Sequence, residues 1–315
     1  MSGDDPVADD DPTTDDNPVT DDDPTTDDDS AADAFDPIAG DRRDVVAVAA
    51  DCDHVSVAVD EPDEGVATVT LSRPDARNAL DARLRRELTA VCTALDDPDR
   101  DAGVRVVVLT GDAAGKAFVA GADVTELRDR DALEQRRVSE RPRVYETVAA
   151  LRQPVIARVN GHALGGGCEL ALACDVRIAH ERARLGQPEI GLGIMPGGGA
   201  TQRLPRLIGE GEAMKLALTG ELIDAATAAE KGLVEEALPD DAFDDRIAEL
   251  AGAMAAKSPT ALFRTKEAVR ASARLPLDQG IDYEAELFVG LFDTADKAEG
   301  IAAFLEGREP EWSGE

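Results

Sequence analysis

Three short apolar runs constrain the fold more than any other feature of this chain. Val104–Thr110 (VRVVVLT), Val155–Val159 and Val176–Ala179 are each typical of a buried strand. Glycines 165–167 follow the second run and lead into a helical pattern over Cys168–Cys174. Because strands and helices alternate and no dinucleotide-binding GxGxxG motif occurs, we expect a layered α/β domain.

Two strand-like segments precede these runs. Val55–Val59 and Val66–Leu71 alternate apolar with small or polar residues, which predicts a strand pair joined by an acidic turn at Glu61–Gly65. Asp81 is placed to cap a following helix, and the Asp-Pro pair at 97–98 is typical of the end of that helix.

From about residue 210 the pattern becomes helical. Asp224 is placed to cap a helix over Ala225–Lys231, which Gly232 ends. A last helix starts at Asp293 or Thr294 and continues to Gly307. Before it, apolar residues recur at helical spacing at Ile281, Ala285, Phe288 and Phe292.

The N-terminal segment differs sharply from the rest of the chain. Residues 1–36 hold fifteen aspartates and neither lysine nor arginine, and DDDPTTDD occurs twice. Such a segment buries too little apolar surface to offset its ordering entropy. We therefore predict a disordered acidic tail over residues 1–50, an α/β core over 51–245 and a helical lobe over 246–315.

The charge of the chain excludes several classes of partner. Aspartate and glutamate number 66 against 33 lysines and arginines, a net charge of −33. Such a polyanion repels nucleic-acid phosphates and anionic membranes, so neither is an expected partner. Only six of the basic residues are lysines. An acidic, lysine-poor surface is typical of a halophilic protein, because concentrated salt screens the self-repulsion.

Neither a membrane span nor a secretory signal is found in the sequence. A membrane helix needs roughly 18 apolar residues in a row, and no such run occurs. We therefore expect a cytoplasmic protein. The four cysteines form no CxxC pair, so buried free thiols are expected rather than disulfides or a zinc site at Cys52, Cys92, Cys168 and Cys174.

Two glycine-rich segments each place a glutamate beside a turn. In residues 160–169, three consecutive glycines leave a strand and enter a helix whose first turn holds Glu169. Free N–H groups at a helix start, with no side chain in the way, suit an oxygen that gains negative charge. The second segment, residues 186–199, holds Glu189. Taken singly, Glu169 is also explained by helix capping and Glu189 by an ordinary surface charge.

Taken together, six motifs resemble the enoyl-CoA hydratase (crotonase) family, in order and over about residues 54–310. They are RPDARNAL (73–80), KAFVAGADVTEL (116–127), NGHALGGGCELALACD (160–175), GQPEIGLGIMPGGGATQRL (186–204), TGELIDAATAAEKGLVEE (219–236) and FDTADKAEGIAAFLEGR (292–308). The resemblance implies a spiral of repeated ββα units and a C-terminal all-α lobe that serves trimerisation and the CoA pocket. It also implies a homotrimer or a dimer of trimers.

The resemblance further implies an activity. Ala122 and Gly166 match the two positions whose backbone N–H groups form the family's oxyanion hole, and Glu169 and Glu189 match its two catalytic glutamates. The family's isomerases commonly keep only the carboxylate at the Glu189 position, so retention of both favours a lyase, enoyl-CoA hydratase. That enzyme adds water reversibly and syn to trans-2-enoyl-CoA, giving 3-hydroxyacyl-CoA, as in fatty-acid β-oxidation.

We expect the two carboxylates to hold one water between them. In this assignment Glu169 deprotonates the water and Glu189 delivers a proton to C2. No metal or separate cofactor is implied, because coenzyme A is part of the acyl-CoA substrate. An enoyl-CoA isomerase, or a hydratase of a branched or functionalised acyl-CoA, is the alternative. A non-catalytic RNA-binding relative is disfavoured by the net charge of −33.

Coenzyme A would lie along the motif at 73–80 and the loop at 118–123, with its phosphates near Arg77, Lys116 or Arg128. Gly307 stands where the family usually has a CoA-binding lysine, which makes the next residue, Arg308, the candidate substitute. The expected substrate-binding residues are Arg77, Ala79, Leu80, Lys116, Ala120, Asp123, Gly165, Pro188, Gly197 and Arg308.

Overall fold

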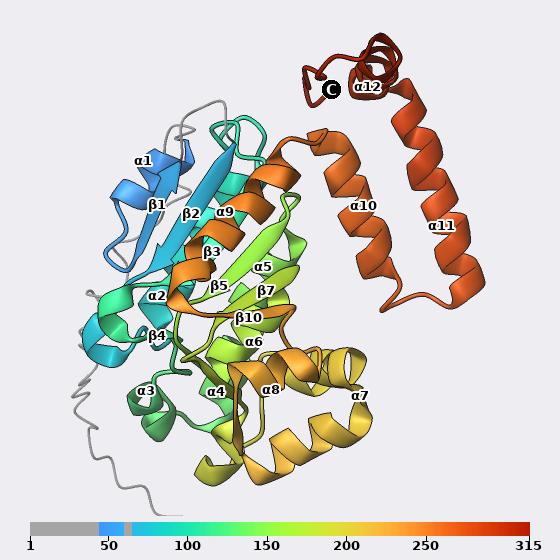
Figure 1. Cartoon of the computed structure of the whole chain (residues 1–315). Helices are drawn as coiled ribbons and strands as arrows, with labels where there is room; N and C mark the ends of the chain where they lie inside the picture. Colours follow the sequence, from blue (N-terminus) through green and yellow to red (C-terminus); the bar gives the residue numbers. More distant parts are fainter. Residues whose placement is uncertain (1–43, 60–64) are drawn as a thin grey trace, which may run out of the picture. The chain divides into compact units, whose positions relative to one another are not determined.

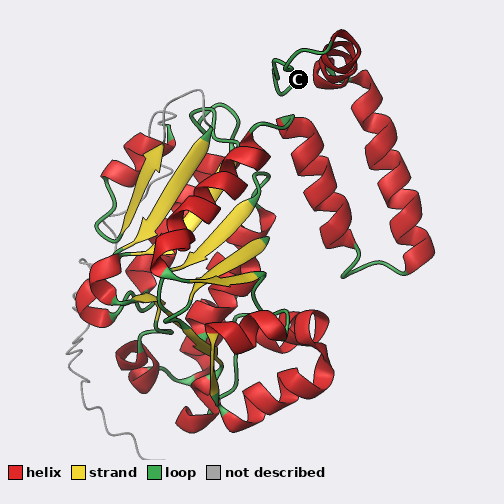
Figure 2. Ribbon diagram, in the orientation of Figure 1, coloured by secondary structure: helices red, strands yellow, loops and turns green. Residues whose placement is uncertain are grey.

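The computed structural model describes residues 44–59 and 65–315 (Figure 1). Most of the acidic tail, and the turn expected between the first two strands, lie outside the described residues. The described part is an α/β structure with two sheets, and residues 239–315 contain helices and loops (Figure 2).

Six strands form the larger sheet. Their order is β1 (Val55–Val59), β2 (Val66–Leu71), β3 (Val106–Gly111), β5 (Val155–Val159), β7 (Val176–His180) and β10 (Glu236–Leu238). β1 pairs antiparallel with β2, placing Val55 opposite Leu71, and every other neighbouring pair is parallel. The strand pair and the three buried strands that the sequence predicts are confirmed. All six residues of β3 are buried, as expected for a parallel strand covered on both faces.

Four short strands form the smaller sheet. Their order is β4 (Ala117–Val119), β6 (His162–Leu164), β8 (Arg184–Gly186) and β9 (Leu222–Asp224). Each of β3, β5 and β7 continues into a strand of this smaller sheet, and a helical segment follows. The chain therefore repeats a strand–strand–helix unit, which confirms the predicted ββα spiral. The loops after β4, β6 and β8 gather beyond the carboxyl ends of the larger sheet's strands, where α/β folds place their sites.

The helices cover the sheets and connect the strands. α9 (Asp240–Ala255) crosses one face of the larger sheet (Figure 1), and its residues Phe243, Ile247 and Ala251 share a buried cluster with Val106 and Ile178. The predicted boundary at 245/246 therefore falls inside α9. The remaining helices of the core are α2 (Ala82–Asp96), α3 (Val124–Asp129), α4 (Ala132–Val138), α5 (Val144–Ala150), α6 (Gly166–Ala173), α7 (Ala200–Thr219) and α8 (Ala225–Glu230), with 3₁₀ turns η1 (Pro74–Ala76), η2 (Ala113–Gly115) and η3 (Pro188–Leu192).

The first described element lies within the segment assigned to the tail. This helix, α1 (Val45–Ala50), is capped by Asp44, whose carboxylate accepts a 2.8 Å hydrogen bond from the Ala47 N–H. Val45 and Val48 are buried, and α1 contacts α2 and β1. Burial of this short apolar run explains why ordered structure begins before residue 51.

The C-terminal lobe consists of α10 (Pro259–Ala271), α11 (Leu277–Gly290), η4 (Leu291–Asp293) and α12 (Ala295–Glu306). Thr294 caps α12, and it is one of the two starting residues that the sequence predicts for this helix. α11 and α12 leave a row of large apolar side chains exposed, from Leu277, Ile281, Phe288, Val289, Phe292, Ile301, Phe304 and Leu305. The apolar stripe predicted at 281–292 thus has no cover within the described chain.

All four cysteines are free, with Cys92, Cys168 and Cys174 buried and Cys52 half-buried. Burial of the first three agrees with the sequence prediction. Within residues 44–59 and 65–315, no helix is both long enough and apolar enough to cross a bilayer.

Candidate active site

A cavity of about 1190 Å³ collects most of the residues singled out in the sequence. It lies among the loop after β4, the start of α6, η3 and the loop that precedes α7. The sequence-predicted residues that line it are Ala120, Ala122, Gly165, Gly166, Glu169, Pro188, Glu189 and Gly197. Residues up to 113 positions apart in the chain, Arg85 and Gly198, therefore line one cavity.

Two backbone N–H groups on the lining of this cavity belong to Ala122 and Gly166. The Leu80 N–H donates to the Gly121 carbonyl at 2.8 Å, and the Asp123 N–H donates to the Leu80 carbonyl at 3.0 Å. Because extended backbone alternates its direction, the N–H of Ala122 points away from Leu80. Its nitrogen lies 3.4 Å from the position that a Cβ on Gly166 would occupy. No described residue accepts a hydrogen bond from either the Ala122 or the Gly166 N–H, so both are available to one oxygen.

At each of the three consecutive glycines, an added Cβ would meet a different neighbouring group. A Cβ on Gly165 would lie 2.8 Å from Oε1 of Glu189, and Gly165 has a φ of +50°, which side chains disfavour. A Cβ on Gly166 would lie 2.9 Å from the Tyr145 hydroxyl. A Cβ on Gly167 would overlap the Val119 carbonyl oxygen, at 1.9 Å. The glycines therefore let the start of α6 lie against β4 and the second glutamate.

Glu169 is almost fully buried, with 2% of its surface exposed. Its Oε1 accepts two backbone hydrogen bonds, from the Gly198 N–H at 2.6 Å and from the Ala200 N–H at 3.0 Å. Burial raises the pKa of Glu169, while these N–H groups and the nearby guanidinium groups of Arg143 and Arg203 lower it. The second oxygen, Oε2, has no hydrogen bond from a described residue. Glu169 thus presents one fixed oxygen and one free oxygen.

Glu189 has a different environment. Its Oε2 is buried and has no hydrogen-bond partner among the described residues. Burial, with a contribution from the charge of Glu169, raises the pKa of Glu189 to about 7. Near neutral pH, Glu189 therefore holds a proton much more readily than a free glutamate does. Two neighbouring carboxyl groups whose pKa values are set by different surroundings are typical of an acid and a base working together.

Tyr145 of α5 lines the same cavity but is absent from the sequence-predicted set. A Cβ on Gly198 would lie 2.6 Å from the Cζ of Tyr145 and 2.6 Å from Oε2 of Glu169, so the Tyr145 ring and the Glu169 carboxylate both lie against Gly198. Burial raises the pKa of the Tyr145 phenol, which keeps it protonated. Arg143 also lines the cavity, and its guanidinium lies 5.9 Å from the Tyr145 ring centroid. No motif or spacing in the sequence singles out Tyr145, because periodicity does not indicate which residue of α5 faces the glycine turn.

The cavity continues between α3–α4 and η3 as a largely apolar space. Leu127 and Val138 stand on one side, and Ile190, Leu192 and Met195 on the other. Each arginine here has a carboxylate partner that the structure describes, and Arg85 and Arg130 share Glu126. Those ion pairs are Arg85–Glu126 at 2.8 Å, Arg130–Glu126 at 2.5 Å and Arg143–Glu146 at 2.5 Å.

Several predicted substrate-binding residues do not line this cavity. Leu80 is fully buried, and the Ala79 carbonyl accepts a 2.7 Å hydrogen bond from Arg73. The Asp123 carboxylate caps α3 and pairs with Arg73 at 3.0 Å. Arg77 and Lys116 are exposed on left-handed turns near Leu80 and β4.

Arg308 follows α12 and is paired within the lobe. Its guanidinium contacts Glu299 at 2.5 Å and Glu306 at 2.7 Å. It is not among the residues that line the cavity. A role for Arg308 in binding CoA therefore stays a prediction.

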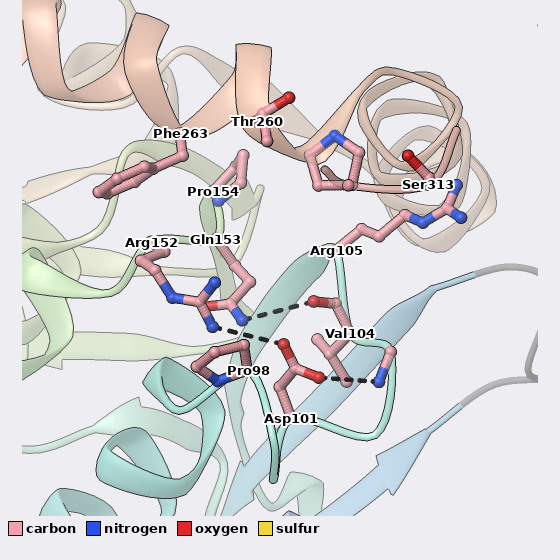
Figure 3. Close-up of a pocket in the computed structure, with 13 residues that line it drawn as sticks. Pro98, Asp101, Val104, Arg105, Arg152, Gln153, Pro154, Thr260, Phe263 and Ser313 are labelled. Carbon is pink, nitrogen blue, oxygen red and sulfur yellow. Dashed lines mark hydrogen bonds and ion pairs between the residues drawn. The ribbon is translucent and has the colours of Figure 1, made fainter. Parts of the chain in front are cut away.

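A second cavity, of about 380 Å³, lies between α10 and the loops that precede β3 and β5 (Figure 3). Arg152 points toward Asp101 there, at 3.4 Å, and the Gln153 side chain donates to the Val104 carbonyl at 3.4 Å. Among the described residues, its lining holds one carboxyl group, that of Asp101. The larger cavity is therefore the candidate active site.

Comparison with known proteins gives consistent matches. A family model described as enoyl-CoA hydratase/isomerase matches residues 61–315. The 2,3-dehydroadipyl-CoA hydratase of Escherichia coli K12 is 45% identical over 249 residues, which cover 79% of this chain and 95% of that protein. A probable enoyl-CoA hydratase of Mycobacterium bovis is 43% identical over 256 residues, 80% of this chain and 96% of its own. A crystal structure of an enoyl-CoA hydratase from Bacillus anthracis matches with a TM-score of 0.76 at 40% identity, covering 83% of this chain and 100% of that one.

Proposed function

Because the chain belongs to the enoyl-CoA hydratase/isomerase family, we infer that it is an enoyl-CoA hydratase, which adds water reversibly across the C2–C3 double bond of a trans-2-enoyl-CoA. The observation that carries this function is that two carboxyl groups and two backbone N–H groups without a described acceptor line one cavity. Glu169 is fixed by N–H donors, whereas the pKa of Glu189 is raised to about 7. A base and an acid are thus present together.

The geometry supports a separate chemical role for each of these groups. The N–H groups of Ala122 and Gly166 receive the thioester oxygen, which makes C3 electrophilic; one such donor contributes about 3–4 kcal/mol in other enzymes. The carboxylate of Glu169 takes a proton from water as its oxygen bonds to C3. Glu189 gives its proton to C2 as the enolate collapses. The proton gained by Glu169 equals the one lost by Glu189, so exchange with solvent restores the pair.

We propose that the acyl group is uncharged. The far part of the cavity is apolar, and each arginine that lines it among the described residues already has a carboxylate partner. A terminal carboxylate on the acyl chain would find no free cation there and would be desolvated. We therefore expect kcat/KM for crotonyl-CoA to exceed that for 2,3-dehydroadipyl-CoA by at least about 10-fold. Equal values for the two substrates would contradict this specificity.

Coenzyme A is proposed to approach from the side of Arg77 and Lys116. Both side chains are exposed, and no ion pair with another described residue is recorded for them. Either cation is free to meet the CoA phosphates, which form charge-assisted hydrogen bonds. The acid, the base and the oxyanion donors all come from the chain, so we propose that the enzyme uses no further cofactor.

We also propose that the protein is a cytoplasmic homo-oligomer, a trimer or a dimer of trimers. The exposed apolar side chains of α11 and α12, including Phe288 at 60% and Phe304 at 84% exposure, support burial against other subunits. An oligomer could also bring Arg308 of one subunit toward the CoA of another. The free thiols fit a reducing compartment.

The test is the hydration of crotonyl-CoA in concentrated salt, followed by the loss of the enoyl-thioester absorbance. We expect turnover by the wild type and losses of at least about 10²-fold for both Glu169→Gln and Glu189→Gln. Glu181→Gln, an exposed glutamate outside the cavity, is the matched control and should retain full activity. If only Glu189→Gln lost activity, an isomerase-like site would replace this proposal. No turnover by the wild type would point to a branched or functionalised acyl group.

A further inference from the structure

The loop between η3 and α7 holds the carboxylate of Glu169. The two hydrogen bonds that fix Oε1 come from the N–H groups of Gly198 and Ala200, at 2.6 and 3.0 Å. A Cβ on Gly198 would lie 2.6 Å from Oε2 of Glu169, so the loop backbone also lies against the free oxygen. Any shift of this loop therefore changes both the position and the charge stabilisation of Glu169.

Two arginines from separate elements fasten the same loop. Arg203, in the first turn of α7, donates from Nη1 to the Gly198 carbonyl at 3.0 Å. Arg143, at the N-terminus of α5, donates from Nη1 to the Gly197 carbonyl. Consecutive carbonyls are thus held by guanidinium groups, while the N–H groups on the other side of the loop face Glu169. Arg143 holds the carbonyl of the peptide that carries the Gly198 N–H, and polarisation of that carbonyl makes this N–H a better donor, because hydrogen bonds in a chain strengthen one another. Arg203 holds the next peptide of the loop.

The two arginines differ in how their charge is balanced. Arg143 pairs with Glu146 at 2.5 Å. Arg203 is half-buried, and no ion pair to another described residue is recorded for it. A half-buried cation without an adjacent carboxylate is costly for the fold alone. Burial lowers the pKa of Arg203, and its interactions with the charges of Glu146 and Glu169 oppose that change.

The charged and titratable groups around Glu169 show how Arg203 stabilises its carboxylate. Arg143 and Arg203 are the cations near its carboxylate, and their charges lower its pKa. Tyr145, Glu189 and Cys168 also interact with Glu169, from α5, η3 and the start of α6. Tyr145 and Cys168 stay neutral, because burial raises the pKa of each. The ionised form of Glu169 therefore depends on the two arginines and the loop they hold.

We propose that Arg203 is a positioning residue, which acts through the Gly198 carbonyl to hold the 197–200 loop so that Glu169 remains a carboxylate with Oε2 directed at the water. Arg143 fixes the preceding peptide of the same loop. This inference rests on the proposed hydratase function, in which Glu169 is the base. It assigns to Arg203 no contact with substrate.

The test compares pH profiles of kcat/KM for crotonyl-CoA, from about pH 5 to 9, for the wild type, Arg203→Met and Arg203→Lys. In Arg203→Met the acid-side midpoint should move upward by roughly one pH unit, because Glu169 loses a stabilising charge. Its plateau rate should fall about 10-fold, with KM little changed. Arg203→Lys keeps the charge and should restore the midpoint. Arg206→Met is the matched control: Arg206 is exposed one turn further along α7, so its profile should equal the wild type.

A merely structural role for Arg203 gives a different result. Activity would then fall by the same factor at every pH, with the acid-side midpoint where the wild type has it, and that outcome would overturn the proposal. So would a wild-type profile in Arg203→Met. Isotope-edited infrared titration of the Glu169 carboxyl, in a Glu189→Gln background, gives a readout independent of turnover. In Arg203→Met the pKa of Glu169 should show the same upward shift. In Arg203→Lys it should stay near the value found with Arg203 in place. Both results are expected even if crotonyl-CoA proved not to be a substrate.

Discussion

At the scale of residues, the two glutamates share a cavity but not an environment. Glu169 receives two N–H hydrogen bonds on one oxygen, whereas Oε2 of Glu189 is buried without a described partner. A carboxylate that accepts N–H bonds is stabilised in its charged form, and a desolvated one is destabilised. These different surroundings support the proposed roles of Glu169 as the base and Glu189 as the acid.

The raised pKa of Glu189 predicts a pH dependence. Burial raises the pKa of Glu189 to about 7, so the proton that hydration needs is bound below that value and lost above it. We expect kcat/KM for hydration to decline as the pH rises through about 7, with about a tenfold fall per unit beyond the midpoint. Initial rates with crotonyl-CoA across the pH range give the profile. A rate that stays constant to about pH 9 would show that Glu189 is not the acid.

Gly165 is a sensitive position for the same carboxyl group. An added methyl would lie 2.8 Å from Oε1 of Glu189, on a residue with a φ of +50°. Gly165→Ala should displace Glu189 and lower the hydration rate by about 10²-fold, as misplacement by about 1 Å does elsewhere. Gly211→Ala in α7, where a methyl meets nothing within 4 Å, is the control. Wild-type rates in Gly165→Ala would mean that Glu189 need not pack against this turn.

At the scale of elements, an ion cluster fastens α10 to the core. Asp175, just before β7, pairs with Lys266 at 2.7 Å and with Arg270 at 2.6 Å. Its Oδ2 also accepts a 2.8 Å hydrogen bond from the Val155 N–H. One carboxylate thus joins the end of α6, the start of β5 and one face of α10.

Asp175→Asn tests this attachment. Lys266 is 8% exposed, and burial lowers its pKa, so the loss of its partner leaves a desolvated ammonium. Removal of one member of a buried pair costs about 3 kcal/mol, and we expect a destabilisation of that order. Urea unfolding of the variant and of Asp278→Asn, on the exposed start of α11, would measure it. Equal midpoints for the two variants would show that other contacts hold α10.

Some features of these elements could be predicted from the sequence, and others depend on tertiary packing. The alternation of strands and helices and the helix cap at Asp81 could be predicted, because periodicity and turn chemistry are local signals. The ββα order and the pairing of Glu169 with Glu189 followed from the motifs that resemble the enoyl-CoA hydratase family. Tyr145, and the contacts of Arg143 and Arg203 with the 197–200 loop, could not be predicted. The hydrogen bond from Arg143 to the Gly197 carbonyl joins residues 54 positions apart, and it depends on how α5 packs against α6. The helical spacing of the apolar residues at 281–292 could be predicted, but periodicity does not indicate whether another part of the protein covers them.

At the scale of the whole molecule, the net charge of −33 is the dominant property. Repulsion between like charges disfavours the compact and associated states, and salt screens it over about 8 Å at 0.15 M and about 3 Å at 1 M. The ion pairs around α10 and the cavity are less exposed to that screening. We propose that the protein is adapted to concentrated salt.

Dialysis into dilute buffer tests this adaptation. We expect loss of crotonyl-CoA hydration or dissociation of the oligomer, because unscreened acidic surfaces repel one another. Sedimentation and activity, measured on the same samples before and after dialysis, separate these two effects. Return to concentrated salt should restore both if the chain has not aggregated. Full activity and an unchanged assembly size in dilute buffer would contradict the proposed adaptation.

The most direct test of the central claim is the origin of the product's oxygen. Crotonyl-CoA is incubated with the enzyme in ¹⁸O-labelled water, and the product is analysed by mass spectrometry. Two carboxyl groups acting on one water predict 3-hydroxybutyryl-CoA with a single labelled oxygen at C3, formed by the wild type and lost in Glu169→Gln. A product of unchanged composition with a shifted double bond, and no label, would contradict hydration and assign the site to isomerisation.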